Sequence, residues 1–355
     1  MSNQLIDTAD DVREGEELDV DAIDAWLKQR VEGLEGRPEV TQFSGGASNW
    51  TYRLAYPSHD LILRRPPAGT KAASAHDMAR EYQVQERLKP VFPYVPPMVA
   101  LCQDESVIGA EFYVMERLQG IIPRANMPRG LELDEATTRR LCHSVIDKLV
   151  ALHQVDVDAA GLIDLGKGAG YVKRQIEGWT ERFARARTWN VPRFSYVTRW
   201  LADNMPEDVA TCVIHNDFRL DNCVFDPADP TKVIGILDWE MATLGDPLMD
   251  LGNALALWTQ ADDDRIARAM RRQPTHLPGM LTRNEVVEYY CQQTGRSIDN
   301  WAFYEVYGLF RLAVIAQQIY YRYHHKQTRN PAFRHLWVMV NYLYWRSRNV
   351  IRRAG

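Results

Sequence analysis

The chain has 355 residues, of which 46% are hydrophobic and 25% are charged, a composition typical of a globular protein with two domains or two lobes. The formal net charge of -5 gives no indication of nucleic-acid binding, and no apolar run approaches the roughly 20 residues that a membrane-spanning helix requires. The five scattered cysteines predict neither a zinc site nor a disulfide framework. With an N-terminus unlike a secretory signal, they favour a cytoplasmic protein.

The first hundred residues predict a small lobe rich in β-structure. Residues 1–18 are acidic and poor in apolar side chains, so we expect a flexible acidic tail that is mobile or loosely docked. Asp19 is a suitable N-cap for a helix whose apolar residues follow at helical spacing. Strand-like runs and one further helix come next, and the predicted ranges are 40–43, 50–56, 61–65 and 111–116 for strands and 75–88 for the helix. We therefore predict an N-terminal lobe over residues 19–116.

The hydrophobic period becomes helical after about residue 120. Two short strands are predicted within residues 211–240, and the predicted helices are 134–152, 171–188, 193–203, 247–260, 282–294, 300–323 and 332–350. Asp134 caps the first of these helices. Residues 117–355 therefore predict a larger, mostly helical lobe, and the whole chain an α+β fold with two lobes.

The two short strands each end in polar side chains of a particular kind. Residues 213–222 read Val-Ile-His-Asn-Asp-Phe-Arg-Leu-Asp-Asn, and residues 233–240 read Val-Ile-Gly-Ile-Leu-Asp-Trp-Glu. The first segment has the spacing His-x-Asp-x-x-x-x-Asn of a kinase catalytic loop, and the second ends where a kinase places a metal-binding aspartate. Two ordinary β-hairpins would have no reason to place all four groups in this register.

This spacing predicts a role for each side chain. Asp217 is the expected catalytic base or hydroxyl-positioning carboxylate, because a phosphoryl acceptor must be held in line with the γ-phosphate. Asn222 and Asp238 offer the oxygen ligands that Mg²⁺ prefers. His215 is expected to brace the loop, with His153 buried beneath it.

The predicted small lobe holds candidate phosphate ligands. Arg64 lies at the end of a predicted strand, where a kinase carries its phosphate-binding lysine, and Glu81 on the next helix is its expected ion-pair partner. Arg65 could take the same role if the register is shifted by one residue. Gly45, Gly46 and Ser48 belong to a glycine-rich turn whose backbone N–H groups could cover the phosphates, although most such turns are simple hairpins.

Two further segments carry weaker signals. Glu116 and Leu118 follow a predicted strand and should form the connector between the lobes, where a kinase backbone binds adenine. Asp246 is better suited to capping a helix than to catalysis, whereas Asp250 on that helix could face the site.

These motifs, together with Gly-Asp-Pro-Leu-Met-Asp at 245–250, resemble those of the aminoglycoside phosphotransferase and choline kinase-like family. More narrowly, Leu-Arg-Arg-Pro-Pro at 63–67, Arg-Glu-Tyr at 80–82 and Asn-Trp-Ala-Phe-Tyr at 300–304 are similar to a branch whose members occur fused to, or beside, acyl-CoA dehydrogenases. The resemblance covers residues 38–325. It implies a protein-kinase-like bilobal fold, ATP and Mg²⁺ as cofactors, and O-phosphorylation of a small molecule.

The resemblance also sets two expectations for single residues. It implies that arginine at position 64 is usual for the branch. The family usually has glycine where this chain has Asn216, so we expect a side chain there to crowd the backbone or to alter the wall of the substrate site.

The sequence as a whole favours an ATP- and Mg²⁺-dependent O-phosphotransferase that acts on a hydroxylated small molecule. Residues 260–285 mix acidic and basic side chains, which suits an anionic acceptor at least as well as a polycation, and the branch resemblance points to a hydroxy acid or its acyl-CoA ester. The alternative is a catalytically weak nucleotide- or acyl-CoA-binding module that partners an acyl-CoA dehydrogenase. A protein kinase is disfavoured, because only six residues separate Asp238 from Gly245 and leave no room for an activation loop.

Overall fold

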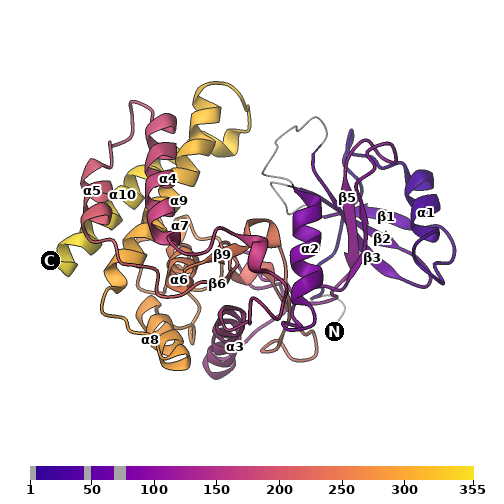
Figure 1. Ribbon diagram of the computed structural model, residues 1–355, viewed down its shortest axis with the longest axis horizontal. Coiled ribbons are helices and arrows are strands. Elements are labelled where there is room, and N and C mark those ends of the chain that lie inside the picture. Colours follow the sequence, from indigo (N-terminus) through magenta and orange to yellow (C-terminus); the bar gives the residue numbers. More distant parts are fainter. Residues whose placement is uncertain (1–4, 44–48, 68–76) are drawn as a thin grey trace.

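The computed structural model describes residues 5–43, 49–67 and 77–355. It has a lobe built on a β-sheet and a larger helical lobe, which lie at opposite ends of the molecule's long axis (Figure 1). This confirms the predicted α+β architecture. Within the described ranges, none of the helices is both long enough and apolar enough to cross a bilayer.

The small lobe is a five-stranded antiparallel sheet with a helix on each face (Figure 1). The strand order is β1-β2-β3-β5-β4. The elements are α1 (Val20–Lys28), β1 (Glu39–Gln42), β2 (Trp50–Ala55), β3 (Asp60–Arg65), α2 (Met78–Leu88), β4 (Met98–Cys102) and β5 (Phe112–Glu116). Strand β4 was not predicted, because it is only five residues long and directly follows the prolines at 93, 96 and 97.

Strand β3 is buried on both faces, and its successive side chains point to alternate faces. Leu61 and Leu63 pack in the cluster beneath α1. Ile62 packs in the opposite cluster with Met78 of α2. Because side chains alternate along a strand, Arg64 lies on the α2 face with Ile62, and Arg65 lies on the other face.

The acidic N-terminal segment, predicted to be mobile or loosely docked, is docked from residue 5 onward. Asp10 forms an antiparallel bridge with Gln42, and the Asp7 N–H donates to the Gly120 carbonyl. Val12 and Leu18 pack against the small-lobe core. The few apolar residues of the segment are therefore sufficient to hold it, because the edge strand β1 offers free backbone partners.

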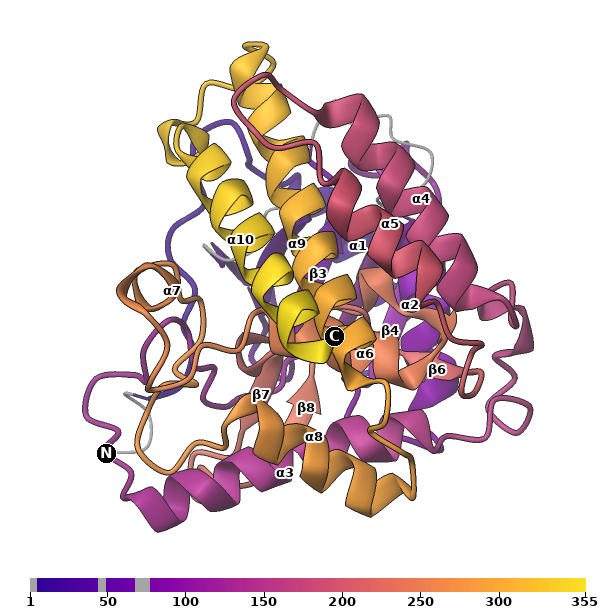
Figure 2. The same ribbon diagram turned by 90° about the vertical axis from the view of Figure 1, so that its left-hand side faces the viewer.

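The large lobe consists mainly of helices around two short two-stranded sheets, β6-β9 and β7-β8. Figure 2 shows α9 and α10 side by side and next to α4 and α5, with α3 and α8 together at the lower edge of the view. The helices are α3 (Glu135–His153), α4 (Tyr171–Ala186), α5 (Ser195–Asp203), α6 (Pro247–Ala256), α7 (Arg265–Ala269), α8 (Arg283–Thr294), α9 (Trp301–His324) and α10 (Leu336–Ala354). The strands and short 3-10 turns are η2 (Ile163–Leu165), β6 (Cys212–Ile214), η3 (Leu220–Asn222), β7 (Cys223–Phe225), β8 (Val233–Ile236), η4 (Trp239–Met241), β9 (Thr243–Gly245) and η5 (Pro331–Phe333).

Helices α6 and α9 cross at two glycines. A Cβ on Gly308 would lie 2.1 Å from the Gly252 carbonyl oxygen, and a Cβ on Gly252 would lie 2.5 Å from the Tyr304 carbonyl oxygen. The close approach presses α6 into the core, where residues 247–255 are all buried. The start of α6 is thereby fixed directly beneath β6, the strand that leads into the catalytic loop.

Candidate active site

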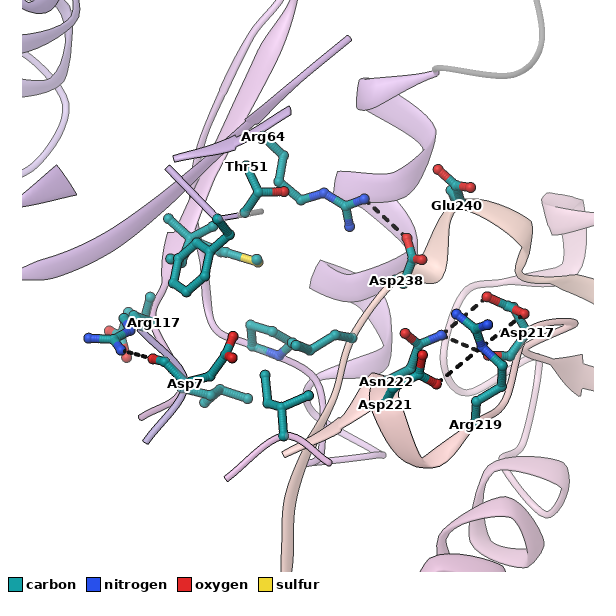
Figure 3. A pocket seen from close by; sticks show the side chains of 18 of the residues that line it. Asp7, Thr51, Arg64, Arg117, Asp217, Arg219, Asp221, Asn222, Asp238 and Glu240 are labelled. Carbon is teal, nitrogen blue, oxygen red and sulfur yellow. Dashed lines mark hydrogen bonds and ion pairs between the residues drawn. The ribbon is translucent and has the colours of Figure 1, made fainter. Parts of the chain in front are cut away.

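A cavity of about 440 Å³ lies between the lobes, with groups from both on its wall (Figure 3). This volume is within the range of small-molecule sites. The side chains that line it are those of Asp7, Phe43, Thr51, Ile62, Arg64, Pro96, Met115, Glu116, Arg117, Leu118, Ile122, Arg124, Asp217, Arg219, Asp221, Asn222, Leu237, Asp238 and Glu240. Four of the candidates singled out from the sequence, Arg64, Asp217, Asn222 and Asp238, are brought together here with the connector pair Glu116 and Leu118.

The predicted catalytic loop joins β6 to β7. Its first residue, His215, connects the loop to the segment after β8 that carries Asp238. The His215 Nδ1 atom accepts from the Asp217 N–H at 3.2 Å, so Nε2 carries the ring proton and donates to the Leu237 carbonyl at 3.0 Å. The Leu237 N–H in turn donates to the Asn222 carbonyl at 2.8 Å. His215 is buried and does not line the cavity, which agrees with a bracing role.

A buried aspartate holds the start of this loop from below. The two Asp250 carboxylate oxygens accept from the backbone N–H groups of His215 and Asn216, both at 2.8 Å. His153 lies 3.1 Å from the same carboxylate and 2.7 Å from the Tyr290 hydroxyl. Complete burial would raise the pKa of Asp250, but the hydrogen bonds from His153 and the loop hold it below its ordinary value. The expectation that Asp250 faces the site is therefore wrong, whereas the buried position of His153 is confirmed.

Asn216 fits its position without crowding the backbone, contrary to expectation. Its φ of 65° is in the left-handed region that glycine adopts most readily and that asparagine tolerates. The side-chain oxygen accepts from the Tyr171 hydroxyl at 3.1 Å, and the amide nitrogen donates to the Met241 carbonyl at 3.1 Å. The Arg311 guanidinium donates to the Asn216 carbonyl at 3.0 Å. Asn216 therefore fastens the loop to α4 and α9 and is absent from the cavity wall.

Asp217 and Asn222 point into the cavity as a pair. The Asn222 amide nitrogen donates to the Asp217 carbonyl at 2.8 Å and to its carboxylate at 3.2 Å. Burial raises the pKa of Asp217, while Arg219, whose Nε lies 3.4 Å from the carboxylate, opposes that shift. A carboxylate with a raised pKa and one fixed oxygen is suited to accepting a proton from a hydroxyl group.

The geometry of Asn222 and Asp238 fits a hard divalent cation. Because the Asn222 nitrogen is engaged with Asp217, its amide oxygen is the group left for a ligand. Asp238 follows β8 with a φ of 68°, which turns its half-buried carboxylate into the cavity. Among the described residues no cluster of three or more histidine, cysteine or acidic ligands occurs, so a metal here would take its remaining ligands from phosphate and water.

Arg64 bridges the two lobes at the inner end of the cavity. Its guanidinium donates to Glu81 on α2 at 2.6 Å and to Asp238 at 3.0 Å. Although burial favours the neutral form, these carboxylates hold the pKa of Arg64 well above its ordinary value, so the charge is permanent. Arg65 instead contacts the Ile108 carbonyl on the opposite face. Of the two arginines, Arg64 is the one placed for a phosphate.

The remaining cofactor-binding candidates divide into two groups. Gly45, Gly46 and Ser48 lie outside the described residues. Glu116 and Leu118 line the cavity beside the connector. Next to the connector, a Cβ on Gly120 would lie 2.5 Å from the Phe225 carbonyl oxygen, so the chain crosses to the large lobe in close contact with β7.

Several residues at the site had no clear signal in the sequence. Arg80 on α2 donates to the carbonyls of Leu165, Glu240 and Ala242, and so joins the helix that carries Glu81 to the loop after Asp238. Asp7, Arg117 and Arg124 also line the cavity, although Arg117 lies between the connector candidates Glu116 and Leu118 and the other two lie outside every motif. The only sequence signal for the first of these roles was the place of Arg80 beside Glu81 in the Arg-Glu-Tyr motif at 80–82.

Comparisons with known proteins agree with this geometry. The family model described as the phosphotransferase enzyme family (APH) matches residues 39–284. Acyl-CoA dehydrogenase family member 10 of Mus musculus is 34% identical over 314 residues, which cover 88% of this chain. The match covers 29% of the mouse protein, so the chain spans less than half the length of this relative.

Solved structures show the same fold. A protein of Ralstonia eutropha JMP134, provisionally named an aminoglycoside phosphotransferase, is 32% identical with a TM-score of 0.78, and the match covers 94% of this chain and 99% of that one. Choline kinase of Cryptosporidium parvum Iowa II is 12% identical with a TM-score of 0.64 over 94% of this chain and 96% of its own. At that identity, the second likeness concerns the fold alone.

Proposed function

The chain belongs to the phosphotransferase enzyme family, and we propose that it transfers the γ-phosphoryl group of ATP to a hydroxyl group of an anionic small molecule. The observation that carries the proposal is the set of Asp217, Asn222 and Asp238 on one wall of an interlobe cavity, opposite Arg64. Phosphoryl transfer requires this combination of a carboxylate for the acceptor, oxygen ligands for a metal and a fixed cation for the phosphates.

In the proposed step, the acceptor oxygen loses its proton and gains the γ-phosphoryl group. The acceptor O–H proton passes to the Asp217 carboxylate as the oxygen bonds to the γ-phosphorus, and the bond from that phosphorus to the β,γ-bridging oxygen breaks to release ADP. Asn222 keeps the second oxygen of Asp217 in place, so that the carboxylate is oriented before the acceptor arrives. The raised pKa of Asp217 makes it a better proton acceptor than an exposed aspartate.

Asn222 and Asp238 would hold Mg²⁺, which supplies charge neutralisation for the phosphates when bound. Arg64 lies 3.0 Å from Asp238 and is the natural partner for phosphate oxygens on the small-lobe side. We expect nucleotide binding to separate Arg64 from Asp238, so that the guanidinium contacts phosphate while Glu81 retains it at 2.6 Å.

An anionic acceptor is favoured over a polycation because the acidic run at residues 262–264 does not line the cavity and its carboxylates are engaged within the protein. Asp263 accepts two hydrogen bonds from Arg283, at 2.7 and 2.8 Å. Asp264 caps α7 and accepts from the Tyr342 hydroxyl at 2.7 Å. These carboxylates are therefore not available to bind a polycationic antibiotic.

Cationic groups, by contrast, gather next to the catalytic loop. Arg219 lines the cavity within 3.4 Å of Asp217. The Gln273 side chain accepts from the Leu220 N–H at 2.8 Å, so the segment that contains Gln273 lies against the catalytic loop. Arg271 belongs to the same segment and donates to the Asn126 side chain. A carboxylate, phosphate or sulfate on the acceptor would find compensating charge here.

We further propose that the anionic acceptor is a hydroxy acid or its acyl-CoA ester and that an acyl-CoA dehydrogenase is a partner. Its support is the position of Arg219 on the cavity wall beside Asp217, together with the relative named acyl-CoA dehydrogenase family member 10, of which this chain matches only a part. A relative's name does not establish its substrate, so the assay must include other acceptors.

The test is a screen of Mg²⁺-dependent ATP consumption with hydroxylated acids, their CoA esters, amino sugars and choline. We expect turnover with an acid or CoA ester, and none for the Asp217→Asn variant. Turnover of amino sugars alone would contradict the acceptor class. Tight binding of ATP with Mg²⁺ but no turnover of any acceptor would instead favour a binding module, and a pull-down with acyl-CoA dehydrogenases would then test the partner.

A further inference from the structure

The N-terminal segment contributes a carboxylate to the wall of the interlobe cavity. Asp7 lines the cavity near the connector, and Figure 3 shows it beside Arg117, at the opposite end from Asp217 and Asn222. This residue lies more than a hundred positions before the other groups on that edge. Neither the sequence motifs nor the family match, which begins at residue 39, includes it.

The backbone of Asp7 is fixed on both sides. Its N–H donates to the Gly120 carbonyl at 3.1 Å, and its carbonyl accepts from the Arg117 guanidinium at 2.6 Å. Arg117 is itself held by Asp60, at 3.0 Å, and is nearly buried. These contacts fix the backbone of Asp7, so its side chain is positioned for a ligand before the ligand binds.

The carboxylate has spare capacity for hydrogen bonds. Within the described part of the chain, its Oδ2 atom pairs with Arg124 at 3.1 Å, and Arg124 is half exposed. No other side chain of the described residues donates to the Asp7 carboxylate. A carboxylate with two oxygens can accept several hydrogen bonds, so Asp7 can bind a donor from a ligand without giving up Arg124.

The position of Asp7 corresponds to the sugar of a nucleotide. Its backbone contacts the connector, whose neighbours Met115, Leu118 and Leu237 form the apolar part of the cavity suited to a base. Its partner Arg124 lines the same cavity, whose other end holds the metal-ligand candidates Asn222 and Asp238. Asp7 therefore lies on the cavity wall beside the part suited to a base, and in a nucleotide the ribose is the unit between base and phosphates.

We infer that Asp7 binds the ribose hydroxyl groups of the nucleotide and thereby selects ribonucleotides over their deoxy forms. Hydroxyl groups are donors that match an acceptor-only carboxylate, and an acidic residue on a ribose hydroxyl is the solution that dinucleotide-binding folds use. The inference rests on the proposed function only in that the cavity takes ATP, and it does not depend on the acceptor.

The test compares the binding of ATP and 2′,3′-dideoxy-ATP, both with Mg²⁺, to the full chain by calorimetry. We expect the wild-type protein to bind ATP about tenfold more tightly than the dideoxy form, the factor that one charge-assisted hydrogen bond supplies. Asp7→Ala should lose this preference by weakening ATP about tenfold while leaving the dideoxy form unchanged. Asp10→Ala, an exposed position of the same segment, is the matched control and should keep the preference.

Two results would overturn the inference. If Asp7→Ala weakened both nucleotides equally, the residue would act through Arg124 or the connector, and Arg124→Ala would then reproduce the effect. If it weakened neither, Asp7 would not contact the nucleotide. Failure of the proposed function has a different signature, because ATP would bind with the ribose preference intact while no acceptor is phosphorylated. Absence of ATP binding to the wild-type chain would overturn both.

Discussion

The substitution Asp250→Asn tests whether the catalytic loop is positioned from beneath. Asp250 is fully buried, and its two carboxylate oxygens accept from the backbone N–H groups of His215 and Asn216 at 2.8 Å. Asparagine has nearly the same shape but only one acceptor oxygen. One of the two N–H groups would therefore face an amide nitrogen that cannot accept its hydrogen bond.

The size of the effect follows from these bonds. A hydrogen bond to a charged group contributes about 1.5–3 kcal/mol, and a buried donor left unpaired costs about 1–3 kcal/mol, so we expect a loss of roughly 2–4 kcal/mol. For 355 residues, an unfolding entropy of about 2.1 cal/mol/K per residue converts 3 kcal/mol into a fall in Tm of roughly 4 °C. Because the loop carries Asp217, a displacement of about 1 Å would also lower kcat by as much as a hundredfold.

The same substitution changes how stability depends on pH. The hydrogen bonds of the folded state hold the pKa of Asp250 below its ordinary value, so the stabilisation is complete above the unfolded-state pKa of about 4 and is lost as the pH falls through the lower folded-state value. The difference in Tm between the wild-type protein and Asp250→Asn should therefore be largest near neutral pH and should shrink below about pH 4.

Thermal unfolding monitored by circular dichroism, with ATP turnover measured in parallel, provides the assay. Asp203→Asn, which changes an exposed carboxylate at the end of α5, is the control and should leave Tm and kcat unchanged. If Asp250→Asn kept both the Tm and the kcat of the wild-type protein, the argument that Asp250 fixes the loop would be refuted.

Three further substitutions test other contacts. Arg64→Lys should raise the KM for ATP about tenfold, because lysine cannot bridge Glu81 and a phosphate as a planar guanidinium does, whereas Arg65→Lys on the opposite face should not change KM. Arg80→Lys should raise the KM for ATP a few-fold and lower Tm, since one ammonium group replaces hydrogen bonds to three carbonyls, and an unchanged KM would exclude a role in lobe positioning. Gly308→Ala should lower the unfolding free energy by about 1–3 kcal/mol in denaturant titrations, because its Cβ would lie 2.1 Å from a carbonyl oxygen of α6; an undiminished value would contradict this packing.

The catalytic set could be predicted from the sequence because phosphoryl transfer fixes the spacing of its parts within a short segment. His215, Asp217 and Asn222 lie within eight residues on one loop, and β-pairing brings Asp238 beside them. The structure places the three cavity-facing groups, Asp217, Asn222 and Asp238, on one wall.

The sequence was less informative about the direction in which a side chain points and about contacts between segments distant in the sequence. Asp250 lies on a helix that is buried all round, so no apolar stripe indicates which way it points. Arg64 and Arg65 are separated by strand alternation, but both faces of β3 are buried, and only the packing of α1 and α2 shows which face borders the cavity. Asp7 joins the site through contacts with residues more than a hundred positions away, which no local pattern encodes.

The most direct test of the account is the release of ADP from ATP and Mg²⁺ in the presence of hydroxylated acids and their CoA esters, measured for the wild-type protein and for Asp217→Asn. We predict acceptor-dependent ADP release by the wild-type protein and a fall in kcat of at least a hundredfold for the variant, with binding of ATP nearly unchanged. Acceptor-dependent turnover that survives in Asp217→Asn at the wild-type rate would contradict the central claim that this carboxylate carries the reaction.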